Sequence, residues 1–179
     1  MAEVMIRPAV SPDYGVLSSF KHSVQTEIVW QMDRMIDDSQ VNIGFREVRL
    51  PRPIKIDYPY SPEGLVERAK NLSVILVACI EGAPVGYLGL STFEAGSISW
   101  IKDLVVHERW RRRGFASVLV RAAKDWSIER DIHRITIEMS SKNYPAICLA
   151  KKHNFEFCGY NDFYYTNNDI AIFFTHHMR

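Results

Sequence analysis

The chain has 179 residues, of which 47% are apolar and 24% charged, and its formal net charge is +1. This length and apolar content predict one domain that buries its own core, and the balanced charge excludes a chain adapted as a whole to a polyanion or an anionic membrane. The longest apolar run, Val74–Ile80, is too short to span a bilayer and residues 1–10 do not resemble a secretory leader, so we expect a cytoplasmic protein.

The first part of the chain predicts a short strand, a helix and a long extended segment. Glu3–Arg7 suits a strand, and Ser11 suits the N-cap of a helix. The apolar residues expected along this helix recur at helical spacing: Val16, Leu17, Phe20, Val24, Ile28 and Met32. Val41–Ile56 alternates like a strand and contains prolines as breakers, and residues 61–63 favour a helix start.

Strands and one amphipathic helix are predicted in the middle of the chain. Val74–Ile80 and Pro84–Thr92 flank a turn at residues 81–83, which favours a hairpin, and Ile98–Val106 follows as a further strand. A helix then begins at Phe115, and its apolar side chains form one stripe: Phe115, Val118, Leu119, Ala122, Ala123 and Trp126. We therefore expect this helix to pack on the sheet.

The last part of the chain predicts a strand, a helix and a second hairpin. The strand Arg134–Met139 turns every second side chain toward the core and leaves Glu138 on the other face. A helix covers about residues 145–154, and Phe155–Tyr165 and Ile170–Thr175 flank the final turn. This order of elements predicts a mixed sheet covered by helices on its faces.

The most informative segment is 109–116, Arg-Trp-Arg-Arg-Arg-Gly-Phe-Ala, a basic cluster that ends in a glycine turn between a strand and a helix. A helix N-terminus offers unsatisfied N–H groups and a partial positive charge, and Gly114 lets a phosphate approach the backbone without meeting a Cβ. Taken alone, such a cluster is more often a solvated basic patch or a weak nucleic-acid contact. The flanking strand, glycine and helix favour a site for a phosphorylated cofactor.

Cysteine and histidine usage predicts no metal site. Cys79, Cys148 and Cys158 are odd in number and fit neither a disulfide framework nor a zinc spacing, so we expect reduced thiols. The histidines show no pair at ligand spacing apart from His176 and His177, which are more simply a polar tail.

Two motifs occur at a separation typical of one enzyme family. The first is Arg or Gln, two residues, Gly, one residue, and Gly or Ala; the second is Asn, two residues, Ala, and an aromatic at the next strand. The matching residues are Arg111, Gly114 and Ala116 for the first motif, and Asn143, Ala146 and Phe155 for the second. Over about Val74–Thr175 the chain thus resembles the GNAT superfamily of acyl-CoA-dependent N-acetyltransferases.

The resemblance implies a fold class and a division of the chain. We expect an α/β protein of the α+β type, with a central mixed, mostly antiparallel sheet of about seven strands flanked by helices. A single domain is expected over residues 1–179, in which 1–73 form the acceptor-side region and 74–179 the acetyl-CoA-binding core.

The resemblance also implies an acetyl-CoA site. The pyrophosphate is expected on backbone N–H groups of residues 112–117, in agreement with the glycine turn, and the acetyl carbonyl on those of Leu104–Val106. Asn143 is expected to bind the pantetheine arm, and the alternative for this residue is a helix cap. The complete set of expected cofactor-binding residues is Leu104, Val105, Val106, Arg111, Arg112, Arg113, Gly114, Phe115, Ala116, Ser117 and Asn143.

For catalysis, the resemblance makes Glu138 the candidate general base, directly or through water, and Asp103 the competing carboxylate. The alternative for Glu138 is a strand residue satisfied by a neighbouring charge. The chain departs from the family at Ala150, where many relatives have a tyrosine as general acid. A thiolate departs tolerably well without a proton donor, so this change need not abolish activity. The tyrosines considered as substitutes are Tyr144, Tyr160, Tyr164 and Tyr165.

The expected function is transfer of acetyl from acetyl-CoA to a primary amine by direct attack. The acceptor is a small molecule or a protein N-terminus, and the expected partners include neither nucleic acid nor membrane, while a homodimer stays open. Carboxylates that can attract a cationic amine are Asp33, Asp37, Asp38, Glu47, Asp57 and Glu63. Two alternatives remain: a catalytically weak or inactive acyl-CoA-binding sensor, favoured by Ala150, and a nucleic-acid-binding protein, disfavoured by the balanced charge.

Overall fold

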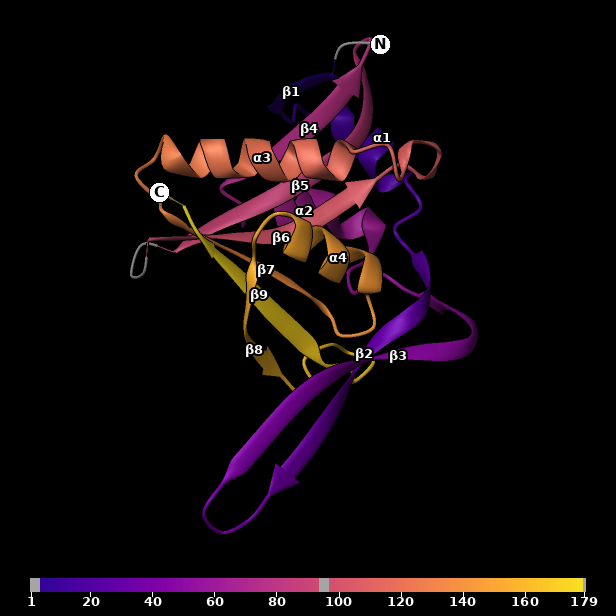
Figure 1. Cartoon of the computed structure of the whole chain (residues 1–179). Coiled ribbons are helices and arrows are strands. Elements are labelled where there is room, and N and C mark those ends of the chain that lie inside the picture. The colour runs from indigo at the N-terminus through magenta and orange to yellow at the C-terminus, as the bar shows by residue number, and fades with distance from the viewer. Residues whose placement is uncertain (1–3, 94–96, 179) are drawn as a thin grey trace.

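The computed structural model describes residues 4–93 and 97–178, which form a central seven-stranded sheet (Figure 1). In spatial order its strands are β1 (Val4–Pro8), β4 (Val74–Ile80), β5 (Ala83–Phe93), β6 (Ile98–Val106), β7 (Arg134–Ser140), β9 (Ala171–His177) and β8 (Glu156–Asn161). Neighbouring strands are antiparallel except β6 and β7, which are parallel. The prediction of a mixed, mostly antiparallel sheet is confirmed.

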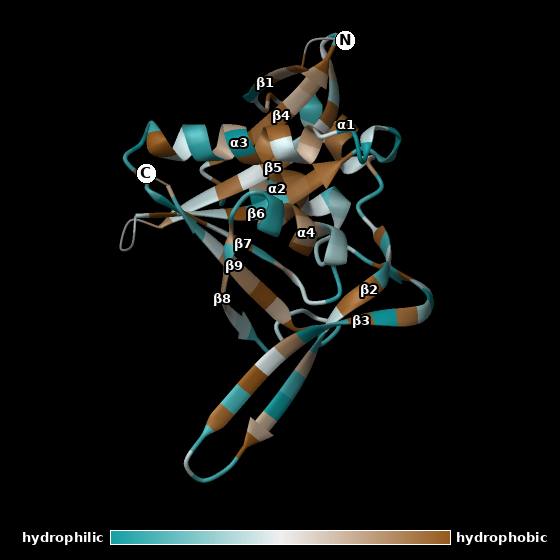
Figure 2. Cartoon of the chain, in the orientation of Figure 1, coloured by the Kyte–Doolittle hydropathy of each residue, from teal (hydrophilic) through white to brown (hydrophobic). Residues whose placement is uncertain are grey.

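Helices cover both faces of this sheet. They are α1 (Asp13–Ser18), α2 (Leu65–Ala69), α3 (Phe115–Ile128) and α4 (Tyr144–Lys152), with 3-10 turns η1 (Pro62–Gly64) and η3 (Glu108–Trp110). Because successive strand residues point to opposite faces, β4 contributes to two cores: Leu76 packs in one with Leu119 of α3, and Val77 in the other with Leu17 of α1. Figure 2 shows the apolar residues along β4, β5 and β6. In the described ranges, no helix combines the length and apolar character needed to cross a membrane.

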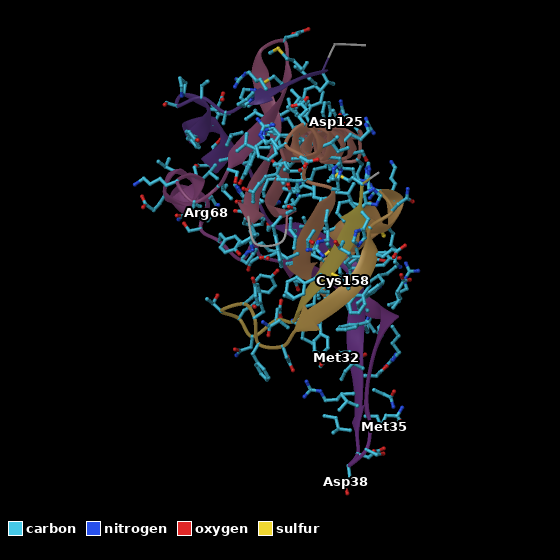
Figure 3. All side chains as sticks on the ribbon, turned by 90° about the vertical axis from the view of Figure 1, so that its left-hand side faces the viewer. Met32, Met35, Asp38, Arg68, Asp125 and Cys158 are labelled. Atoms are coloured by element: carbon cyan, nitrogen blue, oxygen red, sulfur yellow. The ribbon has the colours of Figure 1, made fainter. Side chains whose placement is uncertain are left out.

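A long hairpin stands apart from the central sheet. Its strands, β2 (Val24–Ile36) and β3 (Val41–Ile56), pair antiparallel with each other in a separate two-stranded sheet. Residues 33–46, which we call the arm, project away from the body (Figure 1), and Figure 3 shows Met32, Met35 and Asp38 in succession along this direction.

The structure corrects the helix predicted after Ser11. The helix α1 ends at Ser18, and its N-cap is Pro12 rather than Ser11. The apolar positions from Val24 to Met32 lie in β2 instead. Their helical spacing is overridden by pairing with β3, which supplies hydrogen bonds that no isolated segment can provide. The last predicted hairpin is also shorter than expected, because β8 ends at Asn161.

The parallel strands β6 and β7 diverge partway along their length. Their pairing runs from Ile98 opposite Arg134 to Ile101 opposite Ile137 and then ends. Beyond Ile101, β6 continues alongside β5 up to Val106, and the β5–β6 register shifts around Lys102. Figure 1 shows α4 beside the opening between the two strands. This divergence exposes one edge of β6 and positions the candidate site.

Candidate active site

A groove of about 420 Å³ lies between the end of β6, the N-terminus of α3 and α4. All the predicted cofactor-binding residues line it except Arg113, and the remaining lining comes from His22, Val24, Trp110, Pro145, Ala146, Cys148, Leu149 and Lys152. The guanidinium of Arg113 instead stacks over the ring of Trp110, 5.1 Å from its centroid. The structure therefore brings together the two motifs that the sequence predicts to act jointly.

The glycine turn has the geometry of an anion cradle. Gly114 is the N-cap of α3 and has a φ of 92°, a left-handed conformation that favours glycine. A Cβ added to Gly114 meets nothing within 4 Å, so the space above the turn is open to a ligand. The first N–H groups of α3 have no partner one turn earlier in the helix, and Arg112 adds positive charge at the rim. This end of the groove suits a diphosphate.

Asn143 contributes from the opposite wall of the groove. Its Oδ1 accepts a hydrogen bond from the N–H of Ala146 at 3.3 Å, so the residue is the N-cap of α4. The helix-cap interpretation is thus confirmed, and binding by the side-chain nitrogen remains compatible with it because Oδ1 makes the cap. Asn143 also borders a second cavity.

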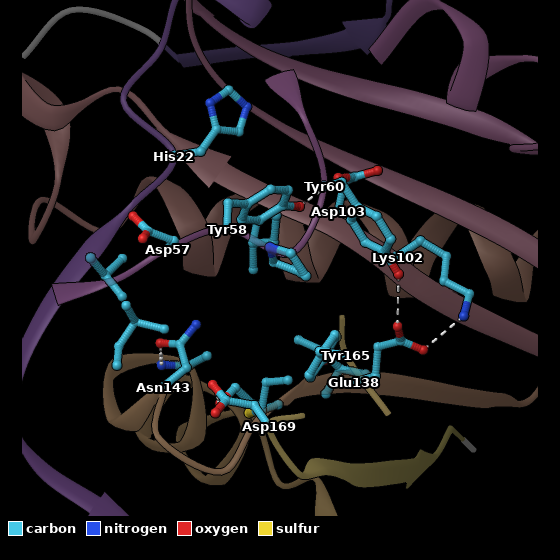
Figure 4. Close-up of a pocket in the computed structure, with 18 of the residues that line it drawn as sticks. His22, Asp57, Tyr58, Tyr60, Lys102, Asp103, Glu138, Asn143, Tyr165 and Asp169 are labelled. Carbon is cyan, nitrogen blue, oxygen red and sulfur yellow. Dashed lines mark hydrogen bonds and ion pairs between the residues drawn. The ribbon is translucent and has the colours of Figure 1, made fainter. Parts of the chain in front are cut away.

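This second cavity, the pocket, has a volume of about 270 Å³ and is lined mainly by β6, β7 and the segments around residues 56–60 and 165–169. Figure 4 shows Tyr58 and Tyr60 on one side of the hollow and Asn143 and Asp169 on the other. The residues that line both the groove and the pocket, which we call the throat, are His22, Val24, Leu104, Asn143 and Ala146. The two cavities therefore adjoin at the throat.

Glu138 lines the pocket and is held by several partners. The carboxylate accepts a hydrogen bond from the Lys102 ammonium at 2.7 Å and from the hydroxyls of Tyr60 and Tyr164 at 3.3 Å each. The Glu138 side chain is only 3% exposed. Lys102 is thus the neighbouring charge expected if Glu138 were only a structural strand residue. Glu138 nevertheless lies on the pocket wall, as a general base would.

Asp103 is more enclosed than Glu138. Its side chain is 1% exposed, and one carboxylate oxygen accepts from Tyr58 at 2.5 Å and from Arg68 at 3.5 Å. Burial, followed by the Asp103 charge, raises the pKa of Tyr58 well above its ordinary value. Tyr58 therefore stays protonated and donates to Asp103. With Arg68, it gives this carboxylate two hydrogen-bond donors.

The family position of the acid tyrosine lies in the core. Ala150 is 2% exposed and packs in the core beneath α4. Among the tyrosines considered as substitutes, Tyr165 lines the pocket, whereas Tyr164 donates to Glu138 and Tyr160 packs edge-on against Phe45. Hydrogen bonding with Cys148, followed by burial, raises the pKa of Tyr144 to about 12.

Several pocket residues escaped the sequence analysis. The missed residues are His22, Tyr58, Tyr60, Lys102 and Asp169. They come from four separate segments of the chain, belong to no motif, and meet only in the folded protein. Sequence alternation along β6 offered a weak signal for Lys102, since it places that side chain on a face different from Ile101.

The carboxylates around the pocket differ from those expected. From the acidic residues considered as an amine-attracting set, Asp57 lines the pocket, and the other five lie outside its lining. The complete charged lining consists of Asp57, Asp103, Glu138, Asp169 and Lys102. Acidic groups therefore outnumber basic ones on the wall, although their partners Lys55, Arg68 and Lys142 offset part of this charge from outside.

Comparison with known proteins agrees with this geometry. Residues 42–155 match the model of the acetyltransferase (GNAT) family. L-amino acid N-acetyltransferase AaaT of Escherichia coli (strain K12) is 34% identical over 89% of this chain and 86% of its own length. An N-alpha-acetyltransferase of Saccharolobus solfataricus (strain ATCC 35092 / DSM 1617 / JCM 11322 / P2) is 30% identical over 77% of this chain and 86% of its own length.

Solved structures show the same fold at low sequence identity. A nourseothricin acetyltransferase superposes with a TM-score of 0.85 at 20% identity, covering 98% of this chain and 99% of that structure. A putative streptothricin acetyltransferase from Bacillus anthracis str. Ames in complex with acetyl coenzyme A gives 0.79 at 19% identity, covering 98% and 100%.

The family match and the curated relatives define an N-acetyltransferase, of a class that takes acetyl from acetyl-CoA. The chain belongs to the acetyltransferase (GNAT) family. The groove fits the donor of this family, because the open space at Gly114, the exposed edge of β6 and the basic side chains of Arg112 and Lys152 line one continuous cavity.

Proposed function

We propose that the protein transfers acetyl from acetyl-CoA to a primary amine by direct attack, with the thioester in the groove and the amine in the pocket. The observation that carries this proposal is the throat, where both cavities are bordered by Leu104, Asn143 and Ala146. Both substrates can be held at once and brought to one point, which replaces a bimolecular encounter by a positioned reaction.

In this proposal, backbone N–H groups of the groove bind the thioester substrate. Those of residues 112–117 hold the diphosphate, and those of Leu104–Val106, on the β6 edge freed from β7, face the acetyl carbonyl. A donor aimed at the developing oxyanion is worth about 2.7–4 kcal/mol in other enzymes. The side-chain nitrogen of Asn143 contacts the pantetheine arm.

Glu138 is the proposed general base, acting directly or through a water molecule. The amine nitrogen loses a proton as it bonds to the acetyl carbon, and the carbon–sulfur bond then breaks to release the CoA thiolate. Glu138 is preferred over Asp103 because the family resemblance places the base at this strand position and because the Glu138 side chain is the less enclosed of the two, 3% against 1% exposed. Direct attack is favoured over a covalent acetyl-cysteine intermediate. Cys148 lines the groove, but its hydrogen-bonded neighbour Tyr144 is protonated at neutral pH and cannot act as the base that would activate the thiol.

The acceptor is a primary amine of a small molecule or of a protein N-terminus. The relatives named above are described as acting on L-amino acids and as an N-alpha-acetyltransferase, and the pocket has room for a compact amine-bearing group. The acidic excess on its wall favours an amine that arrives protonated over an anionic molecule. We propose that the enzyme works in the cytoplasm, in keeping with the free thiols of Cys79, Cys148 and Cys158.

Product analysis tests this function. The protein is incubated with acetyl-CoA and a panel of L-amino acids, short peptides with free N-termini, and polyamines, and released CoA is measured together with the mass of each product. We expect an increase equal to one acetyl group on the amine of at least one panel member. A second incubation with a cell extract, followed by mass spectrometry, extends the search beyond the panel.

A second candidate is an acyl-CoA-binding sensor with weak or absent catalysis. Ala150 favours it, since the residue supplies no hydroxyl and lies in the core. Tight acetyl-CoA binding by calorimetry, without consumption in the panel or the extract, would favour the sensor over the enzyme. The nucleic-acid alternative gains no support from the arginine cluster, because Arg113 stacks on Trp110 and Arg111 is engaged within the protein.

A further inference from the structure

The side chain of Arg111 connects the groove to a distant part of the chain. Its Nε donates to the carbonyl of Val106 at the end of β6 at 3.0 Å. Its Nη1 donates to the carbonyl of Ser23 at 2.8 Å, and its Nη2 donates to the carbonyl of Lys21. Each nitrogen of the guanidinium therefore donates to a main-chain oxygen, and two of these oxygens belong to the segment that precedes β2.

His22 lies in the sequence between Lys21 and Ser23, two of the three residues whose carbonyls Arg111 binds. The residue is 7% exposed and belongs to the throat. Its Nδ1 lies 2.6 Å from the carbonyl of Phe20 and its Nε2 lies 2.9 Å from the hydroxyl of Tyr87. Because a backbone carbonyl only accepts, Nδ1 carries the proton and Nε2 accepts from Tyr87. The imidazole is thus a fixed part of the throat wall, as its position above the hollow in Figure 4 illustrates.

The position of Val24 adds a second link to the same segment. Val24 also belongs to the throat and pairs with Ile56, which lines the pocket. Holding the carbonyls of Lys21 and Ser23 therefore fixes the point at which the chain enters β2 and one wall of the pocket. A planar guanidinium suits this task, since its donors point in fixed, separate directions.

The competing role for Arg111 is that of a positive charge for the diphosphate. That role requires the guanidinium to turn toward the groove, which leaves three carbonyls without their donor. Arg112, the next residue, is exposed and lines the groove, so it supplies a charge at that place without such a loss.

We propose that Arg111 is a positioning residue whose guanidinium clamps residues 21–24, and with them His22 and Val24, onto the throat, and that it does not bind the diphosphate. The inference rests on the proposed function for the reaction that the throat serves. The clamp itself is independent of that reaction, so it is tested by binding and spectroscopy as well as by kinetics.

Two substitutions separate the clamp from the charge. Arg111→Gln removes both, whereas Arg111→Lys keeps the charge but replaces the rigid fork by a single ammonium. For both variants we expect the CoA dissociation constant, measured by calorimetry, to stay within about twofold of the wild-type value. Arg112→Gln is expected to weaken CoA binding more than either, and Arg121→Gln, an exposed position on α3, serves as the control.

The kinetic measurement uses the panel amine that the wild-type protein acetylates fastest. At saturating acetyl-CoA, we expect kcat/KM for this amine to fall by about 10- to 100-fold in both Arg111 variants, because a displaced throat misplaces the amine relative to the thioester. Arg121→Gln is expected to leave kcat/KM unchanged.

The titration of His22, followed by NMR, reports the clamp directly. Burial lowers the pKa of His22, and the charged side chains that interact with it include Asp103, Arg68, Arg111 and Glu63. Arg111→Lys retains the positive charge, so a rise of the His22 pKa in that variant reports release of the segment rather than loss of charge. The resonance is assigned by its absence from His22→Gln.

Opposite results overturn the proposal. If CoA binding weakens in both Arg111 variants as much as in Arg112→Gln while His22 titrates as in the wild-type protein, Arg111 is a phosphate contact and not a clamp. If no panel amine is acetylated, the proposed function is what fails, and CoA binding and the His22 titration still decide the role of Arg111.

Discussion

The ammonium of Lys102 lies 2.7 Å from a carboxylate oxygen of Glu138, across the point where β6 and β7 have begun to diverge (Figure 4). The Lys102 ammonium also lies 4.5 Å from the ring centroid of Trp100, which supports its orientation. The proposed base is therefore held in one place by a cation, and its second oxygen faces the hydroxyls of Tyr60 and Tyr164. The role of Glu138 as the base is tested by the pH dependence of the reaction rate.

Glu138→Gln is expected to lower kcat at neutral pH by about 10²-fold or more, because the amide does not accept the amine proton. The deficit is expected to shrink at higher pH, as a growing fraction of the acceptor amine is already neutral. Steady-state rates from neutral to alkaline pH measure both effects. Glu67→Gln, at an exposed position on α2, is the control. A deficit that stays constant across the pH range rejects Glu138 as the base.

Gly114→Glu is expected to weaken CoA binding by at least about tenfold, or about 1.4 kcal/mol, because it places a side chain and a negative charge at the proposed diphosphate site. Gly82→Glu is a matched control, since Gly82 also has a left-handed φ, of 81°, with open space around its Cβ, but lies in the β4–β5 turn. The left-handed strain, about 1–2 kcal/mol, is thus common to both variants. Calorimetry that finds equal CoA affinity in the two variants would place the diphosphate elsewhere.

Asp13 is expected to make folding stability depend on pH. Its carboxylate accepts from Arg7 at 2.6 and 2.8 Å and from the N–H of Val10 at 2.8 Å, and the bonds from Arg7 lower its pKa in the folded protein. A lowered pKa gives stability that is complete above the unfolded value of about 4 and is lost as the pH falls through the folded value.

Asp13→Asn is accordingly expected to lower the free energy of unfolding by about 3–5 kcal/mol at neutral pH, and by much less at about pH 2. Urea denaturation at both pH values measures this difference. Asp33→Asn breaks an exposed pair with Arg46 and is expected to cost about 1 kcal/mol or less. If the two variants lose similar amounts of unfolding free energy, the Arg7–Asp13 pair contributes no more to stability than an exposed ion pair.

Trp30→Ala is expected to lower the free energy of unfolding by about 3 kcal/mol, because Trp30 anchors the hairpin to the body. Its ring lies 5.7 Å from that of Phe174 and under the Lys151 ammonium, and the substitution removes both contacts while keeping the bond from the Trp30 backbone N–H to the Ser141 carbonyl. Met35→Ala, at a position 63% exposed on the arm, is expected to change stability by no more than about 0.5 kcal/mol. Thermal and denaturant unfolding compare the two, and equal effects would contradict this anchoring role.

The parts of the fold predicted correctly are those governed by local rules. The segment from β6 through Gly114 into α3 combines a strand, a left-handed turn and one apolar stripe, and each is readable within a few residues. In contrast, Val24–Ile36 carries apolar residues at helical spacing yet pairs with a strand that begins beyond its own C-terminal end. The extended character predicted for Val41–Ile56 was the signal for this, since an isolated strand needs a partner.

The groove was more predictable than the pocket for a related physical reason. Its residues are consecutive along β6 and α3, so one motif places most of them. The pocket is assembled from separate segments that carry His22, Tyr58, Glu138 and Tyr165. Whether a carboxylate such as Asp103 is free or enclosed depends on Tyr58 and Arg68, and sequence spacing does not reveal these neighbours.

On either side of the point where β6 diverges from β7, the two cavities are built from different kinds of structure. The groove, which is the proposed thioester site, is formed largely by one strand edge and one helix end, and substitution of a side chain leaves the main-chain N–H groups there in place. The opposite wall is built from loop segments around residues 57–60 and 165–169, which tolerate replacement more readily than a sheet does. Under the proposed function, changes in these loops are expected to alter which amine is accepted while the proposed thioester site is retained.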